Sequence, residues 1–442
     1  MKHFITILLA AAAVLAAAAC KDDRDRVIVF IEPVDASITS PASETPNHVF
    51  YEANPRLFAV TDQLSALRDH FSEMNSYGYD VLWLMPIYPI GTMKAFGSPY
   101  CVKDYKAIRP EFSTMDEFSS FVAQYHAENE ENKIILDWVA NHTAWDHPWV
   151  TEHPDWYVKD GQGNIVYPET WTDVAQLNYS NTELREAMID AMSFWVEKGI
   201  DGFRCDYAHG VPDSFWSDAI TRLKLINPNL LMLAETDYER FFDDGFDVIY
   251  CRSLKQGLVN LFAGRTSPGA FMTERYAQAV ENVPAGKAKL FFITNHDDAS
   301  EISPVKQFPG SNATISAFLL ATALDGSSLI YSSQEIGYPS TLNFFENAVL
   351  DWDSNWSYTS KFKDAMQVLI HFHRGKGFKS YVSGSTIWII FEDGYLAVNT
   401  TGNTVKVEIP PEIPREADKS KRKDFIVLDP YDFDITGCPT DI

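Results

Sequence analysis

Basic side chains are scarce in this 442-residue sequence. Only 36 Lys and Arg residues stand against 61 Asp and Glu residues, which gives a formal net charge of −25. Because binding to nucleic acid requires a basic surface, this balance argues against such a partner. Intrinsic disorder is excluded for a different reason, since hydrophobic residues make up 46% of the chain. We therefore expect a folded protein with a large core, whose acidic surface tolerates a neutral substrate.

Long apolar runs are missing after the first twenty residues, so any membrane attachment is expected at the N-terminus. Lys2 and the alanine-rich run from Phe4 to Ala19 are typical of an export signal over residues 1–19. Cys20 follows three alanines, which resembles the cleavage site of bacterial lipoproteins; an ordinary signal peptide with an incidental cysteine is the alternative. The segment 21–23 (KDD) resembles the tag that directs lipoproteins of Bacteroidetes-type bacteria outward. We expect an exported protein, lipid-anchored to the outer membrane at the cell surface.

Cysteines are few, and no two of them have the C-x-x-C spacing of zinc or redox sites. The four after Cys20 are Cys101, Cys205, Cys251 and Cys438. Disulfides in an oxidising compartment are one alternative, and free buried thiols are the state that we expect.

Three further regions follow the signal. Residues 20–46 are charged and then rich in Ser, Thr and Pro, which predicts a tether. Residues 47–377 alternate short apolar strands with amphipathic helical stretches, and eight strands in this pattern predict a (β/α)₈ barrel of the α/β class. No Gly-x-Gly-x-x-Gly follows the first strand, which argues against an open doubly wound sheet. Residues 378–442 alternate as in a small antiparallel β domain.

The strands and helices of the barrel are assigned from this pattern. The predicted helices include 64–77, 184–198 and 214–226. The predicted strands are 49–51, 80–85, 133–137, 202–206, 230–235, 246–250, 290–294 and 328–331.

Acidic residues stand at or just after the ends of four predicted strands. They are Asp137, Asp206, Glu235 and Asp297. A single acid there is commonly a helix cap or turn residue, but the carboxyl ends of barrel strands meet at one mouth, where active sites lie. Arg204 lies two residues before Asp206, so their side chains share a face and the guanidinium favours the ionised aspartate. Two such carboxyl groups, one nucleophilic and one a proton donor, are what glycoside cleavage with retention requires.

Four segments, in order, resemble the conserved stretches of the α-amylase family of glycoside hydrolases. They are 137–143 (DWVANHT), 202–208 (GFRCDYA), 233–235 (LAE) and 292–297 (FITNHD). The likeness extends to 83–87, 97–105 and 330–337, and so covers residues 48 to 375 approximately. The family resemblance also implies an inserted B domain at about 141–182, whose aromatic residues are sugar platforms or, for most of them, a small core.

By this resemblance Asp206 is the nucleophile, Glu235 the general acid/base and Asp297 the stabiliser of the transition state. The implied substrate contacts are Tyr100, Asp137, His142, Arg204, His209 and His296. The activity implied is retaining hydrolysis of α-glucosidic bonds in starch, malto-oligosaccharides or related α-glucans. The alternatives are a transglycosylase on the same barrel and a catalytically inactive surface glycan-binding protein. An inactive protein is expected to have lost one or more of the catalytic carboxylates, and all of them are present in this sequence.

Two positions depart from the family pattern. His209 stands where starch-cleaving members commonly have lysine, so contacts on the leaving-group side differ. Gln176 stands where calcium-dependent members tend to place an aspartate, and an amide is a poorer ligand for a hard cation. Asn141 remains as a possible calcium ligand, and we expect no required cofactor.

Overall fold

The computed structural model describes residues 47–353 without a gap, then 359–373, 377–392, 394–411, 413 and 424–436. It also describes the short segments 20–21, 27–30 and 38–40. The predicted export signal and Cys438 lie outside the described residues. Within the described part, no helix is both long and apolar enough to cross a membrane. Cys101, Cys205 and Cys251 are buried free thiols, as expected.

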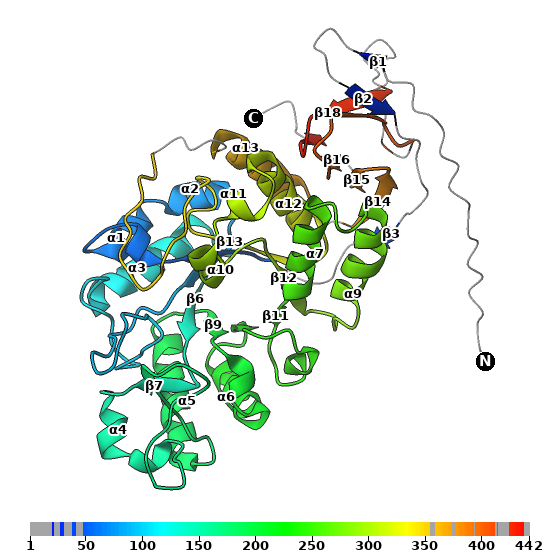
Figure 1. Cartoon of the computed structure of the whole chain (residues 1–442). Helices are drawn as coiled ribbons and strands as arrows, with labels where there is room; N and C mark the ends of the chain where they lie inside the picture. The colour runs from blue at the N-terminus through cyan, green and yellow to red at the C-terminus, as the bar shows by residue number, and fades with distance from the viewer. Residues whose placement is uncertain are drawn as a thin grey trace, which may run out of the picture.

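Eight parallel strands close into a barrel at the centre of the molecule (Figure 1). Each strand pairs with the next one along the chain in the barrel, and β13 returns to pair with β4. This closure confirms the predicted (β/α)₈ architecture. The strands are β4 (Val49–Ala53), β5 (Val81–Leu84), β6 (Lys133–Trp138), β9 (Gly202–Cys205), β10 (Leu231–Ala234), β11 (Val248–Tyr250), β12 (Ala288–Phe291) and β13 (Ser327–Tyr331).

The barrel strands are apolar on both faces because both faces are covered. Side chains such as Phe50, Trp83 and Leu233 fill the interior of the barrel, while alternate residues such as Leu82 pack outward against the helices. The main helices are α1 (Gln63–Arg68), α2 (Phe71–Ser76), α3 (Met115–Glu128), α5 (Thr182–Glu197), α6 (Asp213–Ile226), α7 (Arg252–Phe262), α12 (Ser311–Ala323) and α13 (Thr359–His373). Shorter helices include α4 (Pro148–Glu152), α8 (Pro268–Ala270), α9 (Ala277–Val280), α10 (His296–Glu301) and α11 (Pro304–Gln307).

A long insertion separates β6 from β9. It carries α4 and a two-stranded antiparallel sheet, β7 (His142–Ala144) with β8 (Val174–Gln176), and extends below the barrel in Figure 1. Trp156 and Tyr157 are buried in it, whereas Trp145 and Trp171 are only partly buried. Its aromatic residues therefore supply both a small core and part of the surface that faces the barrel mouth.

Two antiparallel-rich sheets follow the barrel at the opposite side of the molecule (Figure 1). One contains β14 (Phe378–Ser383), β15 (Thr386–Ile390), β16 (Tyr395–Asn399) and β19 (Phe433–Thr436), and the other contains β17 (Val405–Glu408) and β18 (Phe425–Leu428). Short strands from within residues 20–46 join both sheets: β3 (Ile38–Ser40) pairs with β14, β2 (Val27–Phe30) with β17, and β1 (Cys20–Lys21) with β2. The segment predicted as a tether thus contributes to the C-terminal sheets.

Candidate active site

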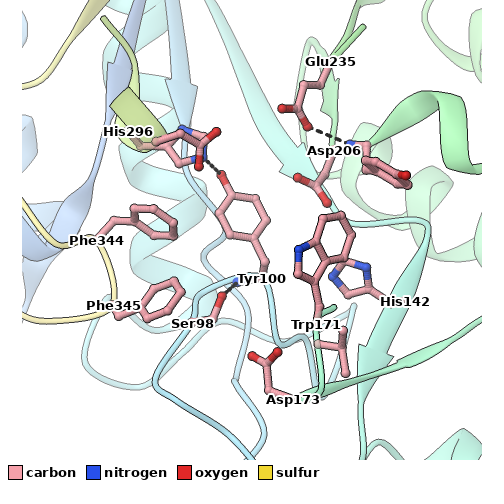
Figure 2. Close-up of a pocket in the computed structure, with 13 residues that line it drawn as sticks. Ser98, Tyr100, His142, Trp171, Asp173, Asp206, Glu235, His296, Phe344 and Phe345 are labelled. Carbon is pink, nitrogen blue, oxygen red and sulfur yellow. Dashed lines mark hydrogen bonds and ion pairs between the residues drawn. The ribbon is translucent and has the colours of Figure 1, made fainter. Parts of the chain in front are cut away.

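A pocket of about 210 Å³ opens beyond the carboxyl ends of the barrel strands. Its position follows from the fold, because the loops after parallel barrel strands meet on one face. Figure 2 shows the pocket with its lining side chains converging from several loops. They are Ser98, Tyr100, His142, Trp171, Asp173, Val174, Asp206, Tyr207, Glu235, His296, Asp297, Phe344 and Phe345.

Arg204, on strand β9, connects three of the four predicted carboxylates. Its Nη1 lies 2.9 Å from Oδ1 of Asp206 and 2.8 Å from Oδ1 of Asp137, and its Nη2 lies 3.0 Å from Oε2 of Glu235. The guanidinium is fully buried beneath the pocket. Its planar fork therefore fixes the positions of Asp206 and Glu235 relative to each other.

Asp137 is completely buried at the end of β6 and does not line the pocket. Besides Arg204, its carboxylate accepts hydrogen bonds from Trp83 Nε1 (3.1 Å) and the Tyr100 hydroxyl (3.0 Å). The structure therefore places Asp137 behind the pocket wall, where it orients Arg204 and Tyr100.

Burial raises the pKa of Asp206 well above its usual value, and repulsion from Glu235, Asp137 and Asp297 acts in the same direction, whereas Arg204 opposes it. Burial likewise raises the pKa of Asp137, against the effect of Arg204. Since these acids share one guanidinium, they titrate as a group. The ionised form of Asp206 thus depends on Arg204.

Glu235 follows β10 directly, and both of its oxygens have donors. Oε2 accepts from the main-chain N–H of Tyr207 at 2.8 Å, and Oε1 accepts from Nη2 of Arg252 at 2.9 Å. Tyr207 has a positive φ of 43°, a conformation uncommon for a residue with a Cβ. This backbone geometry turns the amide of Tyr207 toward Glu235.

His296 joins the first barrel strand to the pocket. Its Nδ1 contacts the fully buried Glu52 of β4, and its Nε2 lies 2.8 Å from the Tyr100 hydroxyl and 3.4 Å from Oδ1 of Asp297. The Tyr100 and His296 rings are stacked with centroids 5.4 Å apart. The result is a continuous polar network from Glu52 through His296 and Tyr100 to Asp137.

The charges of this network shift its pKa values. Burial alone lowers the pKa of His296, but attraction by Asp297 and Glu52 outweighs it and raises the pKa to about 9. Desolvation raises the pKa of Asp297, whereas His296, Arg204 and Arg252 lower it more strongly, so its pKa lies below the usual value. Near neutral pH, His296 is therefore protonated and lies beside an ionised Asp297.

The remaining predicted contacts divide between the pocket and its rim. His142 lines the pocket, and burial lowers its pKa to about 4, so it is neutral near pH 7. His209 is exposed, lies outside the lining residues and packs its ring 4.2 Å (centroid to centroid) from that of Tyr207. Contact between His209 and a bound ligand thus requires a ligand that extends beyond the pocket.

Asn141, the possible calcium ligand predicted from the sequence, lies directly before β7 in the insertion. Asn141 Nδ2 lies 3.4 Å from Nδ1 of its neighbour His142, and Gln176 pairs with His142 across the β7–β8 sheet. In the described part of the chain, no three His, Cys, Asp or Glu side chains gather as a group that could hold a metal ion. Calcium prefers a shell of carboxylate and carbonyl oxygens.

Several residues that line the pocket or contact its lining side chains were not predicted from the sequence. Glu52 is a charged residue in an otherwise apolar strand, which is a signal that could have identified it. Arg252 begins α7, Asp173 lies in the insertion, and Phe344 and Phe345 follow β13. These four lie in loops or at a helix start without a strand-end pattern, so only the folded chain brings them to the pocket or, for Arg252, to Glu235.

Comparison with known proteins gives related sequences and folds. Residues 50–232 match the family model described as alpha amylase, catalytic domain. The chain is 29% identical over 337 residues to alpha-amylase 3 of Dictyoglomus thermophilum, covering 66% of this chain and 64% of that protein. It is 30% identical over 320 residues to an alpha-1,4-glucan:maltose-1-phosphate maltosyltransferase of Rhodospirillum rubrum, covering 66% of this chain and 43% of that one. The chain thus spans less than two thirds of each relative.

A solved structure shows the same fold. The alpha-amylase from Lactobacillus plantarum aligns with a TM-score of 0.73 at 22% identity, over 89% of this chain and 99% of that chain. The aligned portion is longer than the barrel alone.

Proposed function

Since this chain belongs to the α-amylase family of glycoside hydrolases, we propose that it is a retaining hydrolase of α-glucosidic bonds in starch, malto-oligosaccharides or related α-glucans. The observation that carries the proposal is the shared guanidinium: Asp206 and Glu235 both bind Arg204, and Asp297 lines the same pocket. Two carboxyl groups held side by side suit a double displacement with retention.

In this proposal Asp206 attacks the anomeric carbon of the bound sugar and forms a glycosyl ester. Glu235 gives its proton to the glycosidic oxygen, so the leaving sugar departs as an alcohol. Glu235 then takes a proton from water, whose oxygen displaces Asp206 and restores both carboxyl groups. Asp297 stabilises the positive charge that develops on the sugar ring in both steps.

The contacts of Glu235 imply a rearrangement when substrate binds. Its Oε1 is engaged by Arg252 and its Oε2 by Tyr207 and Arg204. A glycosidic oxygen therefore reaches the proton only if one donor moves away. Arg252 is the candidate, since its side chain is 45% exposed whereas that of Arg204 is buried.

A transglycosylase is the second candidate, because one relative is named a maltosyltransferase. Transfer uses the same glycosyl ester, and a sugar hydroxyl replaces water in the second step. A non-catalytic glycan-binding protein is disfavoured, since all three proposed catalytic carboxylates are present and line one pocket.

The test is a time course of products from amylose, pullulan and short malto-oligosaccharides. We expect Glu235→Gln to lose about 10²–10⁴-fold in rate, with a smaller loss on α-glucosyl fluoride, whose leaving group needs no proton. Glu186→Gln, which alters a surface ion pair with Arg222, is the matched control and keeps full activity. A labelled acceptor sugar separates transfer from hydrolysis. Equal rates for wild type and Glu235→Gln on amylose would refute the acid/base role.

We also propose that catalysis requires no bound calcium, because Asn141 and Gln176 offer amides and no carboxylate. Treatment with EDTA, followed by removal of the chelator, is expected to leave the rate on malto-oligosaccharides and the melting temperature unchanged. A loss that added calcium restores would contradict this.

Finally, we propose that the protein is exported and held at the outer membrane by a lipid on Cys20. The proposal is supported by the apolar N-terminal run and by the small residues that precede this cysteine.

A further inference from the structure

One carboxylate in the pocket has no part in the proposed chemistry. Asp173 lines the pocket, comes from the insertion just before β8, and is only 8% exposed. Among the described residues, no side chain donates a hydrogen bond or forms an ion pair with its carboxylate, and the one donor that acts on it is its own main-chain N–H. Buried carboxylates are normally paired, since an unpaired one is costly to desolvate. Asp173 is thus an acceptor with no side-chain partner among the described residues.

The position of Asp173 relative to the catalytic groups indicates which part of a substrate it faces. Figure 2 shows Asp173 reaching toward Ser98, at the opposite end of the labelled residues from Glu235, with Asp206 between them. The proposed proton donor, Glu235, lies on the side of the leaving group. The proposed nucleophile, Asp206, lies next to the anomeric carbon. Asp173 therefore faces the glycone, on the side of the ring away from its anomeric carbon. In a glucopyranose that side carries the hydroxyls on carbons 4 and 6.

The neighbouring groups suit a hydroxyl better than a cation. Ser98 Oγ accepts a hydrogen bond from the Tyr100 main-chain N–H at 3.1 Å and keeps its own proton for donation. A sugar hydroxyl can donate to Asp173 and accept from Ser98 at the same time. No cluster of three metal-ligating side chains occurs among the described residues, so a metal ion lacks partners here. The pocket, at about 210 Å³, is below the range of about 300–1,000 Å³ of drug-sized ligand sites and suits a single hexose.

We propose that Asp173 determines glycone specificity by accepting a hydrogen bond from the 4- or 6-hydroxyl of the sugar whose anomeric carbon meets Asp206. The inference rests on the proposed function and extends it to the recognition of one sugar. Recognition of a free 4-hydroxyl makes the site specific for chain ends, because that oxygen is substituted within an α-1,4-glucan. Recognition of the 6-hydroxyl leaves internal positions open.

The test measures kcat/KM for α-glucosyl fluoride and for its 4-deoxy and 6-deoxy analogues. We expect wild type to disfavour one analogue by about tenfold to a hundredfold, the range for a hydrogen bond to a charged group. Asp173→Ala is expected to cleave that analogue and the parent fluoride at nearly equal rates, since the partner of the missing hydroxyl is gone. Asp173→Asn keeps the side-chain size and controls for packing, and Asp155→Asn, an exposed acid of the same insertion, keeps the wild-type preference.

Different outcomes would overturn the specificity role of Asp173 and the proposed hydrolase function. A wild type that cleaves the fluorides while Asp173→Ala keeps the same preference overturns the inference and leaves the function standing. A wild type that degrades amylose but ignores α-glucosyl fluoride also overturns the inference, because a single glucose then does not fill the site. Inertness on every glucan and fluoride overturns both. Melting temperatures of the variants show whether a loss of rate is a loss of folding.

Discussion

Arg204 is the residue on which the organisation of the site depends. It is a buried cation with contacts to Asp137, Asp206 and Glu235. Burial lowers its pKa, but attraction by Asp137 and Glu235 outweighs this effect and raises the pKa. Truncating such a residue leaves several carboxylates close together without a counter-charge, which is more damaging than the loss of a surface ion pair. The short spacing from Arg204 to Asp206 was visible in the sequence, but its contact with Glu235 was not.

His296 gives a prediction for stability against pH. Its pKa in the folded protein is raised to about 9, above the unfolded value of about 6.5. The protonated form is therefore favoured by folding, and the contribution of His296 to stability is complete below about pH 6.5 and lost as the pH rises through about 9. We expect the free energy of unfolding to fall from pH 7 to pH 10 more steeply in wild type than in His296→Gln.

Urea unfolding of the two proteins at both pH values measures this difference. Groups that do not interact with His296 titrate alike in both proteins, so the variant supplies the background for them. An identical decline in both would show that His296 does not keep its proton in the fold.

At the level of elements, the strands position the site because their carboxyl ends meet at one mouth. Asp206 follows β9 and Glu235 follows β10, and these strands are hydrogen-bonded neighbours in the register Ala234 to Cys205. Any loss of this pairing displaces the proposed nucleophile and proton donor together. The close approach of β9 to β10 is set by Gly202, the first residue of β9.

Gly202→Ala is predicted to disrupt this pairing. A Cβ at residue 202 would lie 1.9 Å from the carbonyl oxygen of Leu231, which is backbone and cannot move aside. We expect a loss of at least about 3 kcal/mol in the free energy of unfolding, or failure to fold. The matched control is Gly161→Ala, which meets nothing within 4 Å and is expected to change stability by about 0.5 kcal/mol or less. Denaturant unfolding and the yield of soluble protein test this prediction. Equal free energies of unfolding for Gly202→Ala and wild type would contradict it.

The helices show where sequence patterns stop being informative. The predicted helix over 64–77 is two helices, α1 and α2, with a break at Asp69 and His70. Its apolar positions continue through the break, so periodicity alone does not reveal it. The predicted strand 290–294 begins two residues earlier, as β12 at Ala288, because pairing with β11 begins there. Such limits depend on hydrogen bonds between elements, which a single-segment pattern does not contain.

At the scale of the whole molecule, the N-terminal segment combines a proposed anchoring role with a structural role. It carries the cysteine proposed to bear the lipid, and its strands β2 and β3 belong to the C-terminal sheets. Both sheets lie away from the inserted segment that borders the pocket (Figure 1). The proposed anchoring at Cys20 would attach the protein through the C-terminal sheets, on the side away from the pocket.

Cys20→Ala is predicted to release the protein into the soluble fraction without changing kcat/KM on short malto-oligosaccharides. Removing the lipid removes the attachment, while the pocket contains no residue of this segment. Fractionation of cells that express the wild type, Cys20→Ala and the cysteine control Cys438→Ala measures it. Retention of Cys20→Ala in the membrane fraction would contradict lipidation at this residue.

The sequence by itself determined the barrel and the four acids at its strand ends. Both are local patterns: strands alternate with helices, and an acid follows an apolar run at a fixed offset. The resemblance to the α-amylase family was likewise contained in short contiguous segments. Those features require no knowledge of what lies opposite them in space.

The tertiary structure decided which groups meet. Glu52 with His296, Arg252 with Glu235, and the isolated carboxylate of Asp173 are far apart in sequence from the groups they contact or face. Strands β2 and β3 likewise pair with strands that follow more than 330 residues later in the chain. Such contacts arise when the barrel closes and the insertion and C-terminal sheets pack, because burial and charge at one residue are set by neighbours that no local pattern encodes.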